Sequence, residues 1–390
     1  MIASHRNSSC DVALYFVCQA LMASTTSLLV ATSAVVGAML SPDARLATLP
    51  AALQQLATFV ATYPASHIMA RVGRRAGFSL GTALGVLGGA AVTLGLVRGS
   101  FVLFCAGTGL IGGHAGFATF YRFAAAESAP PARRERALGW VMSAGVVAAL
   151  LGPRLAQWTK DLWSTPFAGS FAMLLVMALL ALVLLQLLGA PAVQPVPRGH
   201  GVSTRRLVRR PGSLRFTAAA MVSSATMVFV MTATPLAMAS CHHDFASTTE
   251  VIQWHVVAMF APSFLTGRLI ARLGASPVVL GGLVLSAAAA VVNASDASVP
   301  GFHIGLILLG LGWNFAHLGV TTELARVAAE IRATAQGLND LLVSLAAAIA
   351  SLLAGVIVHA TGWRALNLAV LPALVAVGVG VAAAKAPEGE

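Results

Sequence analysis

Long apolar segments separated by short polar connections follow one another along the chain from residue 12 to residue 384. A helix rises about 1.5 Å per residue, so roughly 20 apolar residues span the hydrocarbon core of a bilayer. On that measure the pattern predicts two sets of six spans. The first set covers 12–39, 47–70, 76–97, 101–125, 137–157 and 167–189, and the second covers 214–238, 247–271, 277–293, 302–325, 337–359 and 366–384. We therefore expect an all-α polytopic membrane protein with twelve transmembrane helices.

Composition supports a membrane environment. Hydrophobic residues make up 58% of the 390 residues, charged residues make up only 9%, and the mean hydropathy is +0.84. A water-soluble domain of this length could not bury so much apolar surface. The one clear interruption is a segment rich in proline, glycine and arginine, so the sequence predicts an N-terminal bundle over 1–190, a basic linker over 191–213 and a C-terminal bundle over 214–390.

The net charge of +11 comes from arginines that gather in alternate connections. With the N-terminus inside, the cytoplasmic connections hold Arg6, Arg71, Arg74, Arg75, Arg133, Arg134, Arg136, Arg198, Arg205, Arg206, Arg209, Arg210, Arg215, Arg268, Arg272, Arg326, Arg332 and Lys385. Few basic residues fall on the other side. This asymmetry follows the positive-inside rule and predicts an inner-membrane protein with both termini in the cytoplasm, facing an anionic leaflet. It argues against a nucleic-acid partner. The linker arginines Arg205, Arg206, Arg209 and Arg210 are either a solvated orientation signal or a regulatory or lipid-binding site.

A basic motif occurs once in each half, where one apolar segment gives way to the next. The first copy is Arg71-Val72-Gly73-Arg74-Arg75, and the second runs from Gly267-Arg268 to Arg272-Leu273-Gly274. Two copies at matching positions indicate a repeated six-helix unit and hence two pseudo-symmetric bundles.

These residues resemble the major facilitator superfamily of secondary transporters, whose loop after the second helix has the form G-x-x-x-D-R-x-G-R-R. Ser66 replaces the motif's glycine here, and Ala70 replaces its acid. The resemblance implies a cytoplasmic gate that forms and breaks as the conformation changes. The predicted gate residues are Arg71, Gly73, Arg74, Arg75, Arg122, Glu127, Gly267, Arg272 and Gly274. Asp340 is the expected carboxylate partner of Arg71 or Arg74, with Glu127 as the other candidate, although Asn339 and Asp340 could instead cap a helix.

The same resemblance implies a central cavity lined by the first, fourth, seventh and tenth helices. Placing a polar residue deep in a membrane span costs free energy, so such residues suggest a function. The predicted substrate-binding residues are Gln19, His114, Tyr121, Trp313, Asn314 and His317. Aromatic walls suit a flat organic solute. The alternative for each residue is a packing role between helices.

The sequence has no G-x-x-x-x-G-K-S/T phosphate loop and suggests no cofactor, which leaves ion coupling or facilitated diffusion. The resemblance implies coupling to a proton or other ion gradient. His255, Asp340 and Glu323 are the proton-coupling candidates. No converging catalytic set indicates an enzyme. The outward turn Cys241-His242-His243 has metal-ligand chemistry, but we expect a polar turn and no metal site.

We therefore expect a monomeric secondary transporter that moves a small organic solute by alternating access. Trp313-Asn314-Phe315 and Gln336-Gly337-Leu338-Asn339-Asp340 look like a bacterial subgroup that includes vitamin importers of the riboflavin type. Three alternatives stay open: drug efflux by proton antiport, a transporter-like receptor, and a lipid-handling protein.

Overall fold

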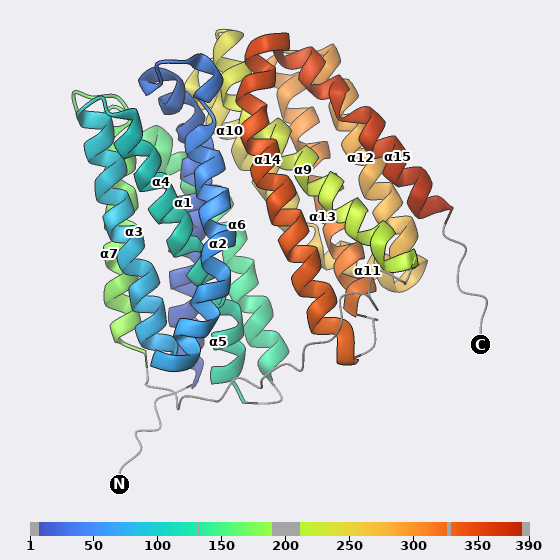
Figure 1. Cartoon of the computed structure of the whole chain (residues 1–390), viewed down its shortest axis with the longest axis horizontal. Coiled ribbons are helices and arrows are strands. Elements are labelled where there is room, and N and C mark those ends of the chain that lie inside the picture. The colour runs from blue at the N-terminus through green and yellow to red at the C-terminus, as the bar shows by residue number, and fades with distance from the viewer. Residues whose placement is uncertain (1–7, 131–132, 189–210, 326–328, 384–390) are drawn as a thin grey trace. The chain divides into compact units, whose positions relative to one another are not determined.

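The computed structural model describes residues 8–130, 133–188, 211–325 and 329–383, and its regular elements in these ranges are helices (Figure 1). The first half contains α1 (Ser8–Leu40), η1 (Ala44–Leu46), α2 (Leu49–Val72), α3 (Arg74–Val97), α4 (Phe101–Ala118), α5 (Tyr121–Ser128), α6 (Arg134–Thr159) and α7 (Ala168–Gln186). The second half contains α9 (Pro211–Ser240), α10 (Phe245–Phe260), α11 (Ser263–Leu273), α12 (Ala275–Ser295), α13 (Val299–Ala325), α14 (Ala329–Ala369) and α15 (Leu371–Ala382).

These helices correspond to the twelve predicted spans. Within the described residues, nine helices are long and apolar enough to cross a membrane on their own, and the bent pair α10–α11 makes a tenth. One of the nine, Leu338–Ala382, contains two predicted spans, because the helix breaks at Gly362 (φ 79°, ψ 174°) and the chain turns back into α15 (Figure 1). The remaining span is α2, which has the length of a membrane helix but carries Gln54 and His67.

Two predicted spans are broken where the sequence analysis expected continuous helices. The span 101–125 divides into α4 and α5 at Thr119 and Phe120. The span 247–271 divides into α10 and α11 at Ala261 and Pro262, with a bend of 43°. Proline lacks a backbone N–H and its ring disfavours a helix through the preceding turn, which explains the second break.

The chain forms two compact units. One comprises Met1–Pro42 with Leu49–Pro197, and the other comprises Asp43–Thr48 with Arg198–Glu390. The short segment that precedes α2 thus belongs to the second unit, where the Thr48 hydroxyl donates to the Leu352 carbonyl oxygen (3.4 Å) and accepts from the Gly355 N–H (3.1 Å). Of the predicted linker 191–213, residues 191–210 lie outside the described residues, and α9 begins at Pro211.

Each unit packs its helices in the same order. In the first unit α1 lies against α6, α3 against α4, and α2 against α4; in the second, α9 lies against α14, α12 against α13, and α10 against α13. These are equivalent pairs when spans are counted from the start of each half. Small residues allow the paired helices to pack closely against each other. A Cβ at Gly107 would lie 3.0 Å from the Gly88 carbonyl oxygen, and one at Gly282 would lie 2.6 Å from that of Gly312.

Candidate functional site

The repeated basic motif forms the same backbone joint in both units. Gly73 ends α2 and begins α3 with φ 86° and ψ 163°, and Gly274 ends α11 and begins α12 with φ 87° and ψ 167°. The Gly73 N–H donates to the Met69 carbonyl oxygen (3.0 Å), and the Gly274 N–H donates to that of Ile270 (2.9 Å). Only glycine adopts this region without strain. The repeat seen in the sequence is therefore a repeat of structure.

The arginines of the first motif contact the neighbouring helices. Arg74 donates to both carboxylate oxygens of Glu127, at 2.7 Å and 3.2 Å, and so joins the start of α3 to the end of α5. Arg75 donates to Gln186 of α7 (3.3 Å), whereas Arg71 is exposed. Glu127 is thus the carboxylate that Arg74 binds within the first unit. Asp340 is exposed on α14 and accepts from the Asn339 amide at 3.3 Å.

The other predicted gate residues lie on α5 and α11. Arg122 is half-buried on α5, with its guanidinium carbon 4.8 Å from the centre of the Phe123 ring and one nitrogen 3.8 Å from the Met142 sulfur. This is a cation–π arrangement. Arg272 is exposed in the last turn of α11, and a Cβ at Gly267 would meet open space.

Two predicted substrate residues pack inside the first unit. Tyr121 is 1% exposed, its ring centre lies 4.6 Å from that of Phe78, and its hydroxyl lies 3.4 Å from the Thr82 hydroxyl. His114 is buried with its ring in close contact with Gly85 of α3. Both side chains therefore fill the interface with α3. Gln19 is half-buried on α1.

Asn314 is buried and makes three hydrogen bonds around the break between α10 and α11. Its amide nitrogen donates to the Met259 carbonyl oxygen (2.7 Å) and the Ser263 hydroxyl (2.9 Å), and its oxygen accepts from the Thr266 hydroxyl (2.6 Å). The side chain therefore connects α13 to both sides of the break. A packing role between helices was the alternative to substrate binding for Asn314, and Pro262 inside the predicted span was a signal for the break.

The proton-coupling candidates differ in their surroundings. His255 is fully buried, and its Nδ1–H donates to the Leu306 carbonyl oxygen at 2.7 Å, so this ring links α10 to α13. Glu323 is half-buried near the end of α13. Asp340, as described above, is exposed.

Trp313 and His317 come together on an accessible face of α13. Their rings are stacked with centres 4.7 Å apart and planes 13° apart. The Trp313 indole N–H donates to the Ser224 hydroxyl of α9 (3.2 Å), and Phe260 packs edge-on against the indole at 6.2 Å. Trp313 is half-buried and His317 is exposed. We refer to Trp313, His317, Ser224 and Phe260 as the aromatic site; the last two were not predicted from the sequence.

The turn after α9 is held by hydrogen bonds. His242 adopts a positive φ of 61°, and the His243 Nε2–H donates to the Ala297 carbonyl oxygen at 2.8 Å. Within the ranges that the structure describes, no three His, Cys, Asp or Glu side chains gather where they could hold a metal ion.

The sequence is similar to those of known membrane transporters. The family model of the Major Facilitator Superfamily matches residues 14–251. The chain is similar to a riboflavin transporter, RfnT, of Brucella anthropi, with 39% identity over 368 residues that cover 93% of this chain and 92% of the relative. An uncharacterized MFS-type transporter of Bacillus subtilis, YdeG, is 32% identical over 190 residues, which cover 48% of this chain and 44% of YdeG.

Solved structures show the same fold at low sequence identity. The crystal structure of a mutant of the nucleoside transporter NupG is similar with a TM-score of 0.77 and 12% identity, covering 96% of this chain and 99% of that chain.

Proposed function

The chain belongs to the Major Facilitator Superfamily and is a multi-pass membrane transporter of a small solute, and we propose that this solute is riboflavin. The observation that carries the proposal is the identity of 39% to a riboflavin transporter over almost the full length of both proteins. The match covers 93% of this chain and therefore extends over both six-helix units rather than one half alone.

The chemistry of the aromatic site agrees with this solute. Riboflavin has a flat, uncharged three-ring system, and stacking of a planar base on an aromatic side chain contributes about 1–3 kcal/mol. Trp313 and His317 supply parallel rings, and the Ser224 hydroxyl that accepts from the indole fixes its orientation. We assign ring binding to Trp313 and His317.

Alternating access is the proposed mechanism. The two units expose the bound solute to each side of the membrane in turn. The Arg74–Glu127 pair lies at a helix junction and is partly exposed, with side-chain exposures of 25% and 52%, so it can exchange partners at modest free-energy cost. We place the protein in the inner membrane with both termini in the cytoplasm, on the distribution of its arginines.

Binding of riboflavin by the purified protein tests the solute and the site separately. Flavin fluorescence should be quenched when the ring stacks on Trp313. We expect Trp313→Ala to weaken binding about tenfold, equivalent to about 1.4 kcal/mol of lost stacking. Trp158→Ala removes an exposed indole of α6 and should leave affinity unchanged. If the wild-type protein does not bind riboflavin, the assignment of riboflavin as the solute is wrong. If Trp313→Ala binds riboflavin as tightly as wild type does, the assignment of the aromatic site is wrong.

We propose in addition that transport is coupled to protons, with Glu323 as the proton-binding group. Glu323 is the only acidic residue of α13, the helix that carries Trp313 and His317, and it is half-buried. His255 is less suited because a buried ring that already donates to a carbonyl would have to accept a charge.

An imposed pH gradient across proteoliposomes should accelerate wild-type riboflavin flux and should have no effect on Glu323→Gln. Asp340→Asn removes an exposed carboxylate of α14 and serves as the matched control. Wild-type flux that is indifferent to the gradient would rule out proton coupling and would leave the riboflavin assignment intact.

A further inference from the structure

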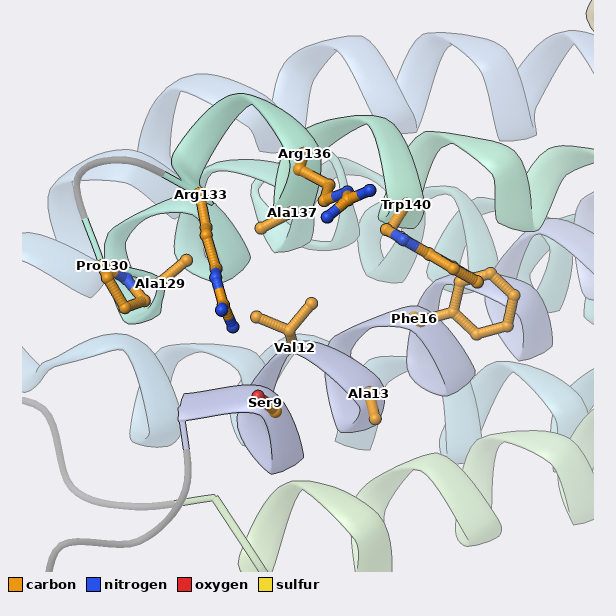
Figure 2. A pocket seen from close by; sticks show the side chains of 10 residues that line it. All are labelled: Ser9, Val12, Ala13, Phe16, Ala129, Pro130, Arg133, Arg136, Ala137 and Trp140. Atoms are coloured by element: carbon orange, nitrogen blue, oxygen red, sulfur yellow. The ribbon is translucent and has the colours of Figure 1, made fainter.

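A pocket of about 360 Å³ opens between α1 and α6 of the first unit (Figure 2). Val12 and Phe16 line it from α1, and Arg133, Arg136 and Trp140 line it from the start of α6. Figure 2 shows the Arg133 side chain extending from α6 toward Val12. We refer to these five residues as the α1–α6 pocket.

The α1–α6 pocket is cationic at one end and apolar at the other. Arg133, Arg136 and Trp140 follow one another at helical spacing, so they share one face of α6. The two arginines lie at the start of the helix, and the indole lies further along it. Phe16 packs edge-on against Trp140, with ring centres 6.0 Å apart. Trp140 remains 60% exposed even so.

The cationic end of the pocket carries the two arginine side chains. Among the described residues, neither Arg133 nor Arg136 forms an ion pair with a carboxylate. The first turn of α6 adds the positive end of its helix dipole. Guanidinium groups bind phosphate oxygens through paired, charge-assisted hydrogen bonds. The pocket thus offers a phosphate site beside an apolar surface.

We propose that the α1–α6 pocket binds an anionic glycerophospholipid. Arg133 and Arg136 hold its phosphate, and an acyl chain lies along Val12, Phe16 and Trp140. The arginines stand on the side that the charge distribution predicts to be cytoplasmic, where anionic lipids are available. Tryptophan at the membrane interface is suited to such a place, because its ring is apolar and its N–H polar. A soluble anion would leave the apolar part of the pocket unused.

A second groove, which has no arginine in its lining, provides a comparison for the α1–α6 pocket. It has a volume of about 480 Å³, lies between α9, α14 and α15 in the second unit, and has Thr226 as its only polar lining side chain. Acyl chains can occupy such a groove, but nothing in it distinguishes one headgroup from another. Selection for an anionic headgroup is therefore expected at the α1–α6 pocket.

Native mass spectrometry of the full-length protein can test this selection with phosphatidylglycerol and phosphatidylcholine of identical acyl chains. Each arginine near an anionic headgroup changes affinity about fivefold. Arg133→Gln and Arg136→Gln, measured separately, should each lower the ratio of phosphatidylglycerol to phosphatidylcholine binding by about that factor. Arg134→Gln removes the same charge from the same helix turn, is exposed and does not line the pocket, so its ratio should equal that of wild type.

Trp140→Ala should weaken binding of both lipids and leave their ratio unchanged, since the indole contacts the acyl chain. Three results would overturn the proposal: a wild-type ratio near one, the same loss of ratio in Arg134→Gln as in Arg133→Gln, or displacement of the bound lipid by equimolar inorganic phosphate. The last result would assign the arginines to a free anion. All substituted residues are exposed, so the variants are expected to fold, and circular dichroism checks this.

Discussion

Removal of the Asn314 side chain should destabilise the second unit, because this buried amide connects α13 to the break between α10 and α11. Asn314→Ala deletes three hydrogen bonds, to Met259, Ser263 and Thr266. Side-chain hydrogen bonds between membrane helices contribute about 0.6 kcal/mol each on average, so three predict a loss of about 2 kcal/mol in the free energy of unfolding. The assay is unfolding by sodium dodecyl sulfate in mixed micelles, followed by circular dichroism.

Asn293 provides a matched control within the same unit. Its side chain is 1% exposed, and neither amide atom has a hydrogen-bond partner among the described residues. Asn293→Ala therefore removes the same side chain without removing a hydrogen bond. Asn314→Ala should be less stable than Asn293→Ala by about 2 kcal/mol. Equal stability of the two variants would refute the argument that the three bonds hold the break.

Three further predictions concern the first unit. Gly73→Ala should lower the free energy of unfolding by about 1–3 kcal/mol, because φ 86° strains any residue with a Cβ. In the control Gly109→Ala the added Cβ meets open space, so the melting temperature should not fall. Equal melting temperatures of the two variants would refute strain at Gly73. Gly112→Val should reduce the yield of monodisperse protein because its Cβ would overlap the α2 backbone; normal yield would contradict this. A double-mutant cycle of Arg74→Gln and Glu127→Gln should give a coupling energy of about 0.5 kcal/mol in the free energy of unfolding. A coupling energy of zero would show that this ion pair does not stabilise the protein.

The spans and their helical character could be predicted from the sequence, because the hydrocarbon thickness sets a length that hydropathy detects directly. The repeat could be predicted as well, since Gly73 and Gly274 need a backbone geometry that glycine alone adopts easily. The breaks at Phe120 and Pro262 were not predicted, because hydropathy measures how apolar a segment is and not whether it is straight.

The candidate site was harder to predict than the fold. A polar residue deep in a span is costly whether it binds solute or a neighbouring helix. Apart from Thr108 and His114, α4 consists of apolar and glycine residues, so its sequence does not show that His114 faces α3. Asn314 has the same polarity in either role, and only its three partners identify it as a structural residue. The spacing of Trp313 and His317 does place both on one helix face, and there they stack.

Riboflavin counterflow in proteoliposomes is the decisive test of transport by this protein. Vesicles loaded with unlabelled riboflavin are diluted into labelled riboflavin, so exchange is detected whatever the direction of net transport and without an ion gradient. We expect transient accumulation of label in vesicles with wild-type protein or Trp158→Ala, and much less accumulation with Trp313→Ala. A protein that binds riboflavin yet shows no accumulation would be a receptor, and the transport claim would be wrong.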